Sequence, residues 1–281
     1  MRFGINTLLW TTDFSSRNFG LLPQIRDHGF HGVEITILNL PSLDVGAVRR
    51  ELEKNGLGCT VCSVLPRELS LLSEDADVWK KTKQHLANCI KATADLGAST
   101  IAGPLYSPVG YLPGRRRTEA EWQRAVTAYQ ELGPVLESHR VNVCLEPINR
   151  FETFFLNTTA DTVRFCQEVN HPRIGILWDT FHANIEEKNP AASLESAGSH
   201  IQHIHISEND RGIPGTGHVD WQGVFQALSR LNYDAWLTIE SFGFAMKDLS
   251  AAAAIWRDLA PTPDDIAWQG VEFLRKSFAS N

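Results

Sequence analysis

Four short apolar runs in the second half of the chain each end in a side chain that can bind a metal ion. Apolar residues belong inside a buried strand, so a carboxylate or an imidazole at its C-terminal tip needs a separate explanation. The side chains are Glu146, Asp179, His205 and Glu240, which follow or close the runs 141–145, 174–179, 201–205 and 235–239. They are 33, 26 and 35 residues apart, and each interval is about one strand plus one helix. The pattern predicts four consecutive strands that present ligands at the same end.

Three carboxylates and one imidazole form an oxygen-rich ligand set. Such a set suits Mn²⁺, Co²⁺ or Mg²⁺ better than a closed structural zinc site. Three carboxylates held close together would also repel one another strongly without a cation to share. A single acidic residue at a strand tip is often only a helix N-cap or a surface charge. The recurrence on four consecutive strands favours a divalent-metal site over that simpler interpretation.

Strand-like and helix-like segments alternate along the chain and must position these side chains. The expected strands are 3–10, 32–36, 58–65, 99–103, 141–145, 174–179, 201–205 and 235–239. The expected helices are 18–28, 44–54, 75–96, 118–139, 159–168, 191–198, 222–231, 251–259 and 264–278. Eight strands in 281 residues give about 35 residues per unit, which predicts a (β/α)8 TIM barrel of the α/β class. No linker or composition break divides the chain, so residues 1–281 are expected to form a single domain.

A doubly wound open sheet is the competing architecture for this alternation. Its dinucleotide fingerprint, G-x-G-x-x-G, should follow the first strand, but the sequence has no such motif there. The barrel is therefore favoured. Because barrel enzymes carry their chemistry at the C-terminal ends of the strands, the barrel also accounts for the position of the four ligand-type residues.

The amino-acid composition limits which binding partners and which cellular compartment are expected. The formal net charge of −7 disfavours nucleic acid and anionic membranes as main partners. The five cysteines are scattered and odd in number, which indicates a reducing cytoplasm rather than a disulfide framework. The C-x-x-C of Cys59 and Cys62 lies in a β-type run, so both are interpreted as strand residues and not as a redox or zinc motif. We expect no signal peptide and no membrane span.

Two further histidines lie near the predicted metal ligands. His203 precedes His205 by two residues, so both point to the same side of a strand and into the barrel. His203 is deeper and is interpreted as a hydrogen-bonded core histidine. His182 follows Asp179 by three residues and could reach a ligand of the metal. The alternative for His182 is an exposed loop histidine.

Several charged side chains fall in the loops at the catalytic end. Arg211, Glu208 and Glu152 would each be interpreted in isolation as solvated charges. The run Arg115–Arg117 is the strongest basic cluster. A solvated loop or a subunit contact is the favoured interpretation of this run, and phosphate binding is the alternative.

Longer motifs around these residues resemble those of the ketose 3-epimerases, the D-tagatose, D-allulose (psicose) and L-ribulose 3-epimerases of the xylose-isomerase-like barrel superfamily. The motifs are Glu146-Pro-Ile-Asn-Arg-Phe-Glu152, Trp178-Asp-Thr-Phe-His-Ala-Asn-Ile-Glu-Glu187, His203-Ile-His-Ile-Ser-Glu-Asn-Asp-Arg211 and Ile255-Trp-Arg-Asp258. The resemblance runs nearly end to end and is strongest from about residue 141 onward. It departs at 147–150, where family members often have Val-Asn-Arg after the metal glutamate. The loops around Asn6 and Trp10 and at 104–117 also match less well.

The resemblance implies roles for the residues at these positions. Glu146, Asp179, His205 and Glu240 would bind a divalent ion, most simply Mn²⁺, with Co²⁺ or Mg²⁺ as alternatives. Glu152, His182 and Arg211 would hold the C1–C2 end of a small ketose. The implied protein is a cytoplasmic homodimer or homotetramer.

The implied reaction is C3 epimerisation of a free ketose through an enediolate. Inversion at a carbon needs a proton acceptor on one face and a donor on the other, and Glu146 and Glu240 are the candidates. The main alternative is an aldose–ketose or hydroxypyruvate-type isomerase, which moves a proton between C1 and C2. An inosose dehydratase, an endonuclease-IV-like phosphodiesterase and a non-catalytic sugar-binding barrel are weaker rivals. The nuclease would need more histidines and a basic face.

Overall fold

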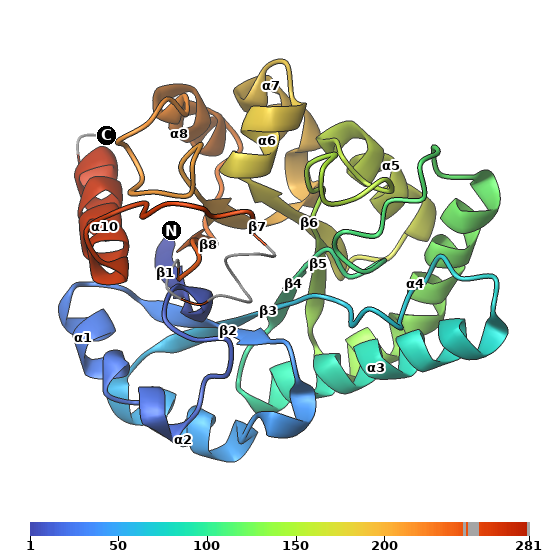
Figure 1. Ribbon diagram of the computed structural model, residues 1–281, viewed down its shortest axis with the longest axis horizontal. Coiled ribbons are helices and arrows are strands. Elements are labelled where there is room, and N and C mark those ends of the chain that lie inside the picture. The colour runs from blue at the N-terminus through green and yellow to red at the C-terminus, as the bar shows by residue number, and fades with distance from the viewer. Residues whose placement is uncertain (244–245, 247–252, 280–281) are drawn as a thin grey trace.

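Eight parallel strands form a closed barrel in the computed structural model of the protein, which describes residues 1–243, 246 and 253–279 (Figure 1). The strands run in sequence order around the barrel, and β1 pairs with β8 to close it. The strands are β1 (Arg2–Asn6), β2 (Gly32–Ile37), β3 (Gly58–Ser63), β4 (Thr100–Gly103), β5 (Asn142–Leu145), β6 (Ile174–Asp179), β7 (Ile201–Ile206) and β8 (Trp236–Ile239). The predicted (β/α)8 barrel is thereby confirmed.

Helices surround the barrel and cover the outer faces of the strands (Figure 1). They are α1 (Leu21–Asp27), α2 (Val45–Asn55), α3 (Ala76–Asp95), α4 (Glu119–His139), α5 (Thr159–Val169), α6 (Thr180–Glu186), α7 (Pro190–Ala197), α8 (Trp221–Arg230) and α10 (Pro263–Ala279). Side chains inside the barrel and side chains beneath the helices are both buried, which explains why the strands are apolar along nearly their whole length. No helix of the described residues is long and apolar enough to cross a membrane.

Local sequence signals determine where several helices begin. The Thr118 hydroxyl accepts the backbone N–H of Glu121, and the Glu121 carboxylate accepts the backbone N–H of Thr118, which is the capping box expected at the start of α4. Asp44 caps α2 in a simpler way, by accepting the N–H of Ala47. These caps satisfy N–H groups that have no partner within the helix.

Three segments differ from the sequence prediction. The first strand ends at Asn6 rather than Trp10, because the Asn6 side chain accepts the N–H of Leu8 and starts a 3₁₀ turn. A short helix, α6, directly follows β6 and was not predicted, because its sequence was interpreted as the strand tip and loop. The helix expected at 251–259 is not present over 253–259, which forms turns and bends, and residues 251–252 lie outside the described residues.

Candidate metal centre and sugar pocket

The four ligand-type side chains meet at the C-terminal end of the barrel. Glu146 follows β5, Asp179 ends β6, His205 lies in β7 and Glu240 follows β8. Each offers one ligand atom, and these atoms lie within 4.8 Å of one another. All four side chains are buried, with Glu240 the most accessible at 6%. The four side chains lie close together because parallel strands of similar length all end at the C-terminal face of the barrel.

Two atoms of this cluster have no hydrogen-bond partner among the described residues. They are Oε1 of Glu146 and Nδ1 of His205, and both are fully buried. Buried polar atoms are nearly always satisfied, so an unsatisfied pair in one cluster points to a missing partner. Nδ1 of His205 lies 3.4 Å from Oε1 of Glu240 and 3.8 Å from Oδ2 of Asp179. A divalent cation bound among these oxygen and nitrogen atoms would give both unsatisfied atoms a partner, so the residues fit a metal ion.

Arg211 is the cation that contacts the carboxylates in this arrangement. Its Nη1 donates to Oδ2 of Asp179 at 3.1 Å, to Oγ of Ser207 at 3.1 Å and to Oε2 of Glu240. Burial raises the pKa of Asp179, but Arg211, His205 and His182 together outweigh burial and hold that pKa well below its usual range. Burial lowers the pKa of Arg211, but Asp179 and Glu240 outweigh it and raise the pKa further above its usual value. Sequence alone suggested a solvated charge for Arg211, and the structure shows that this was wrong.

Glu146 is in a different electrostatic environment from Asp179. Burial raises its pKa well above the ordinary value, and the negative charge of Glu240 raises it further. Its Oε1 lies 3.6 Å from Nε2 of His182. Before a cation arrives, Glu146 is therefore the carboxyl group of the cluster that most readily holds a proton.

His182 lies in α6 and is only 3% exposed, so the alternative of an exposed loop histidine is wrong. The backbone N–H of Asn149 donates to its Nδ1 at 3.1 Å. Burial is the main cause that lowers the pKa of His182 to about 4, so the ring is neutral near pH 7. Its Nε2 lies 3.2 Å from Nη2 of Arg211 and 3.6 Å from Oε1 of Glu146. The ring is therefore held between Asn149, Arg211 and the cluster.

A pocket opens directly above the four ligand-type residues. Its polar wall is formed by Thr36, Cys62, Glu146, Glu152, His182, Arg211 and Glu240. The rest of the wall is apolar and comprises Leu8, Leu38, Val64, Pro104, Val109, Ile148, Phe181, Phe242 and Ala253. Four of the polar groups, Glu146, His182, Arg211 and Glu240, lie next to one another in a chain of contacts, which suits a ligand held there by several oxygens.

Comparison with known proteins identifies the family. The sequence profile of the xylose isomerase-like TIM barrel family matches residues 22–277. A protein named probable ketose 3-epimerase from Synechocystis sp. is 34% identical over 281 residues, covering 100% of this chain and 98% of the relative. The chain belongs to the ketose 3-epimerase family of xylose isomerase-like barrels. Relatives in this family bear the names of isomerase-class enzymes that act on carbohydrates.

Two other similarities bear on the substrate. The crystal structure of a D-allulose 3-epimerase from Methylomonas sp. in complex with D-allulose superposes with a TM-score of 0.92 at 30% identity, covering 98% of this chain and 96% of that chain. A 3-dehydro-D-guloside 4-epimerase from Escherichia coli is 37% identical over 226 residues, which are 77% of this chain and 84% of the relative. Both relatives are named for epimerisation of a sugar, at different carbons.

Two further glutamates at the catalytic end accept hydrogen bonds from neighbouring groups of the protein. Oε1 of Glu152 accepts from Nδ2 of Asn149 at 2.7 Å, and Glu152 also lines the pocket. Glu208 is fully buried and accepts N–H groups from both ends of the loop that follows β7, at Asn209, Gly215, Val219 and the Trp221 ring. It thereby shapes the loop that carries Arg211. The interpretation of Glu208 as a solvated charge was wrong.

The basic run is largely neutralised by carboxylates. Arg115 donates to both oxygens of Glu121, at 2.7 and 2.9 Å. Arg117 donates to both oxygens of Asp161, at 2.8 and 3.0 Å. These bidentate pairs hold the 104–117 loop against α4 and α5, and they favour a structural role over phosphate binding.

The cysteine pair also agrees with its structural interpretation. Cys59 and Cys62 both lie in β3 and are free thiols. Burial raises the pKa of the Cys59 thiol to about 12, so that thiol is protonated and unreactive near neutral pH.

Sequence reasoning missed one buried carboxylate. Glu34 lies in β2 with no exposed surface, and its two oxygens are each 2.7 Å from Nε2 of a histidine, His203 and His205. Burial opposes its charge, but the two histidines outweigh burial and keep the pKa of Glu34 well below the usual range. His203 is thereby confirmed as a hydrogen-bonded core histidine. The only local signal for Glu34 was a charged residue inside an apolar strand.

Proposed function

We propose that the protein catalyses metal-dependent C3 epimerisation of a free ketose of the D-tagatose, D-fructose, D-allulose or L-ribulose type. The observation that carries this proposal is the presence of two buried carboxylates, Glu146 and Glu240, in one ligand cluster at the polar end of the pocket. They come from β5 and β8, which are not neighbours in the barrel. The names and coverage of the relatives support the same activity.

Glu146, Asp179, His205 and Glu240 would hold the ion, with Mn²⁺ as the expected metal and Co²⁺ or Mg²⁺ as alternatives. When bound, a divalent ion supplies positive charge beside the oxygens of the sugar, which makes the proton on the neighbouring carbon more acidic. Asp179 is ionised in the site, because Arg211 keeps its pKa low. It would therefore contribute a full negative charge at any working pH.

Glu146 and Glu240 would move the proton at C3. Inversion requires that one carboxylate remove the proton from one face of the carbon and that a carboxylic acid deliver a proton to the other face. A single base could return the proton only to the face from which it came.

Glu152, His182 and Arg211 would hold the C1–C2 end of the sugar, since all three line the polar end of the pocket. Arg211 offers a guanidinium that can donate to sugar oxygens, the neutral ring of His182 lies beside it, and Glu152 can accept from a hydroxyl. The apolar wall would then face the far end of the ketose.

Solvent proton exchange tests this assignment. The Mn²⁺-loaded protein is incubated in D₂O with D-fructose, D-tagatose and L-ribulose, and the position of the incorporated deuterium is determined by NMR. Deuterium at C3 with appearance of the C3 epimer, both lost on chelation, is the expected result. Deuterium at C1 with appearance of an aldose would instead establish a C1–C2 isomerase, and no exchange with any free ketose would overturn the proposed substrate class.

A further inference from the structure

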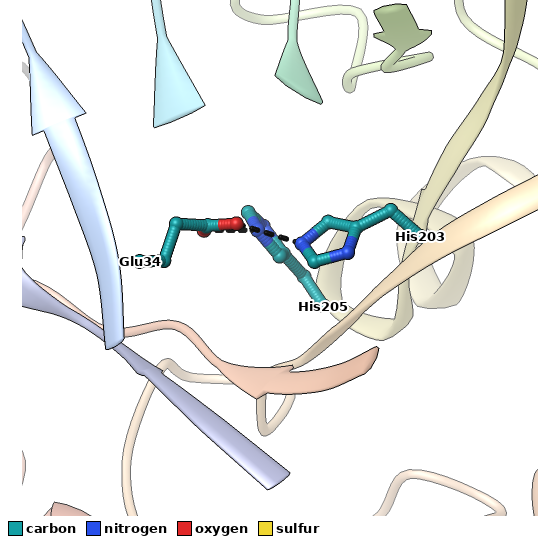
Figure 2. Close-up of side chains that lie close together, drawn as sticks. All are labelled: Glu34, His203 and His205. Carbon is teal, nitrogen blue, oxygen red and sulfur yellow. Dashed lines mark hydrogen bonds and ion pairs between the residues drawn. The ribbon is translucent and has the colours of Figure 1, made fainter. Parts of the chain in front are cut away.

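A buried carboxylate lies in the barrel interior directly below the candidate metal centre. Figure 2 shows Glu34 from β2 pointing at two histidine rings from β7. Its Oε1 accepts from Nε2 of His205 at 2.7 Å and from Nδ2 of Asn6 at 2.9 Å. Its Oε2 accepts from Nε2 of His203 at 2.7 Å and from Oγ1 of Thr60 at 2.9 Å. The carboxylate therefore accepts four hydrogen bonds from β1, β3 and β7.

This set of contacts argues against a second metal site at Glu34, His203 and His205, although the three residues lie close enough to hold an ion. A carboxylate offers about four lone-pair positions, and here each oxygen already accepts two donors. An ion at this place would have to displace hydrogen-bond donors that are buried and have few other partners. Both oxygens of Glu34 are therefore fully used by protein donors, which leaves no lone pair of this carboxylate free for an ion.

The same contacts determine where the His205 ring carries its proton. An ionised carboxylate can only accept, so the Nε2 atom that faces Glu34 must donate. The lone pair that His205 can offer to a ligand is then on Nδ1. That atom faces Glu240 and Asp179, at 3.4 and 3.8 Å, and has no hydrogen-bond partner.

We propose that Glu34 is a positioning residue for the metal centre, and this inference rests on the metal site of the proposed function. Glu34 keeps the proton of His205 on Nε2, fixes the plane of the ring and increases the basicity of Nδ1. A ligating histidine whose second nitrogen donates to a carboxylate is a stronger and better oriented ligand. Among the described residues, the hydrogen bonds of Glu34 go to Asn6, Thr60, His203 and His205, and of these only His205 is a ligand-type residue, so Glu34 acts through His205.

The other partners of Glu34 hold the carboxylate in place before any ion binds. His203, Asn6 and Thr60 come from three different strands and fix both oxygens. The position of His205 is therefore determined by the packed barrel, and not by the ion. A ligand that is ordered in advance loses less conformational entropy when the metal binds.

Glu34→Gln is the decisive variant, because it keeps the shape of the side chain but has one acceptor oxygen in place of two. Binding of Mn²⁺ to the metal-free protein is measured by titration calorimetry. The expected result is an affinity about 10- to 100-fold weaker than that of the unaltered protein. Thr60→Val is the matched control, since it removes one donor to Glu34 in the same layer but leaves the Glu34–His205 hydrogen bond. Its Mn²⁺ affinity is expected to stay close to that of the unaltered protein.

Two spectroscopic measurements separate positioning from a general loss of stability. The visible absorption spectrum of the Co²⁺-loaded protein reports the ligand geometry, and it should change in Glu34→Gln but not in Thr60→Val. In the unaltered metal-free protein, ¹⁵N NMR should find a proton on Nε2 of His205. This last measurement needs no variant, so it tests the proposal even if Glu34→Gln fails to fold.

The outcomes distinguish this proposal from the proposed function. If the unaltered protein binds Mn²⁺ and Glu34→Gln binds it equally tightly with an unchanged Co²⁺ spectrum, the positioning role is overturned and the metal centre survives. A His205 ring without a proton on Nε2 would overturn it as well. If the unaltered protein binds no divalent ion, the metal centre of the proposed function fails and the role of Glu34 fails with it.

Discussion

Replacing Arg211 by methionine should destabilise the metal-free protein strongly. The guanidinium is 5% exposed and pairs with two buried carboxylates, Asp179 and Glu240. Removing one partner of a buried ion pair costs about 3–5 kcal/mol, because the remaining charge is left buried without compensation. Glu146, whose pKa is raised by burial, can take up a proton in response, so we expect the lower end of that range.

A divalent ion should offset part of this loss. The ion supplies positive charge to the same carboxylates, so the difference in stability between Arg211→Met and the unaltered protein should be smaller with Mn²⁺ than without. At a concentration 100 times its Kd, the ion itself stabilises a folded protein by about 2.7 kcal/mol. Arg49→Met is the control: it also breaks an arginine–carboxylate pair, with Glu53, but both side chains are exposed at the surface. Its stability should change little and should not depend on Mn²⁺.

The free energy of unfolding is measured by urea denaturation with and without Mn²⁺, between pH 3 and pH 8. The pKa of Asp179 is lower in the folded protein than its ordinary value of 3.8, so the stabilisation it receives from Arg211 is present above that value and is lost as the pH falls below it. The difference in the free energy of unfolding between the unaltered protein and Arg211→Met should therefore become smaller at acidic pH. The reasoning about the buried pair would be refuted if Arg211→Met lowered the free energy of unfolding by less than about 1 kcal/mol near neutral pH. It would also be refuted if the decrease were equal with and without Mn²⁺.

Three further predictions concern the site and the fold. Glu240→Gln should keep its circular dichroism spectrum and lower turnover by at least about 100-fold, because the amide cannot exchange the C3 proton; full activity would refute its acid/base role. Chelation of the purified protein should abolish C3 exchange and lower Tm, and Mn²⁺ should restore both; activity that survives exhaustive chelation would exclude a metal-dependent mechanism. Glu121→Gln should lose up to about 1 kcal/mol at pH 7, because the amide can still cap α4 but can no longer form the ion pair with Arg115. The pKa of Glu121 is lowered from 4.5 to about 2, chiefly by Arg115, so this loss should disappear as the pH falls from 4.5 towards 2, as followed by thermal melts.

The strand tips show what a local pattern can predict about a site. Apolar runs at intervals of one strand and one helix indicated eight parallel strands, and such strands all end at the same face of a barrel. The convergence of Glu146, Asp179, His205 and Glu240 followed from that regularity, and the structure brings their ligand atoms together. Their roles in metal binding and proton transfer stay predictions for the experiments above.

Arg211 and His182 show what the local pattern left open. The interpretation of Arg211 in isolation as a solvated charge was wrong, whereas for His182 the structure excludes only the alternative of an exposed loop histidine. Both follow strands in segments that carry loop-like or polar residues, and nothing in those segments distinguishes a solvated side chain from a buried one. Arg211 is buried because the loop after β7 turns back over the barrel, with Glu208 accepting N–H groups from both ends of that loop. His182 is buried because α6 begins directly at Asp179 and turns the ring toward Asn149.

The sequence by itself determined the order of the strands, the caps of α2 and α4, and the end of the barrel at which the chemistry lies. These features depend on the periodicity of apolar residues and on turn and cap residues, which act over a few positions. Only the tertiary structure decided the partners across the barrel. Glu34 meets His205 although they are 171 positions apart, because closure of the eight strands places β2 and β7 on facing walls of the interior. Side-chain contacts of this kind depend on the stagger and diameter of the closed barrel, which no short segment encodes.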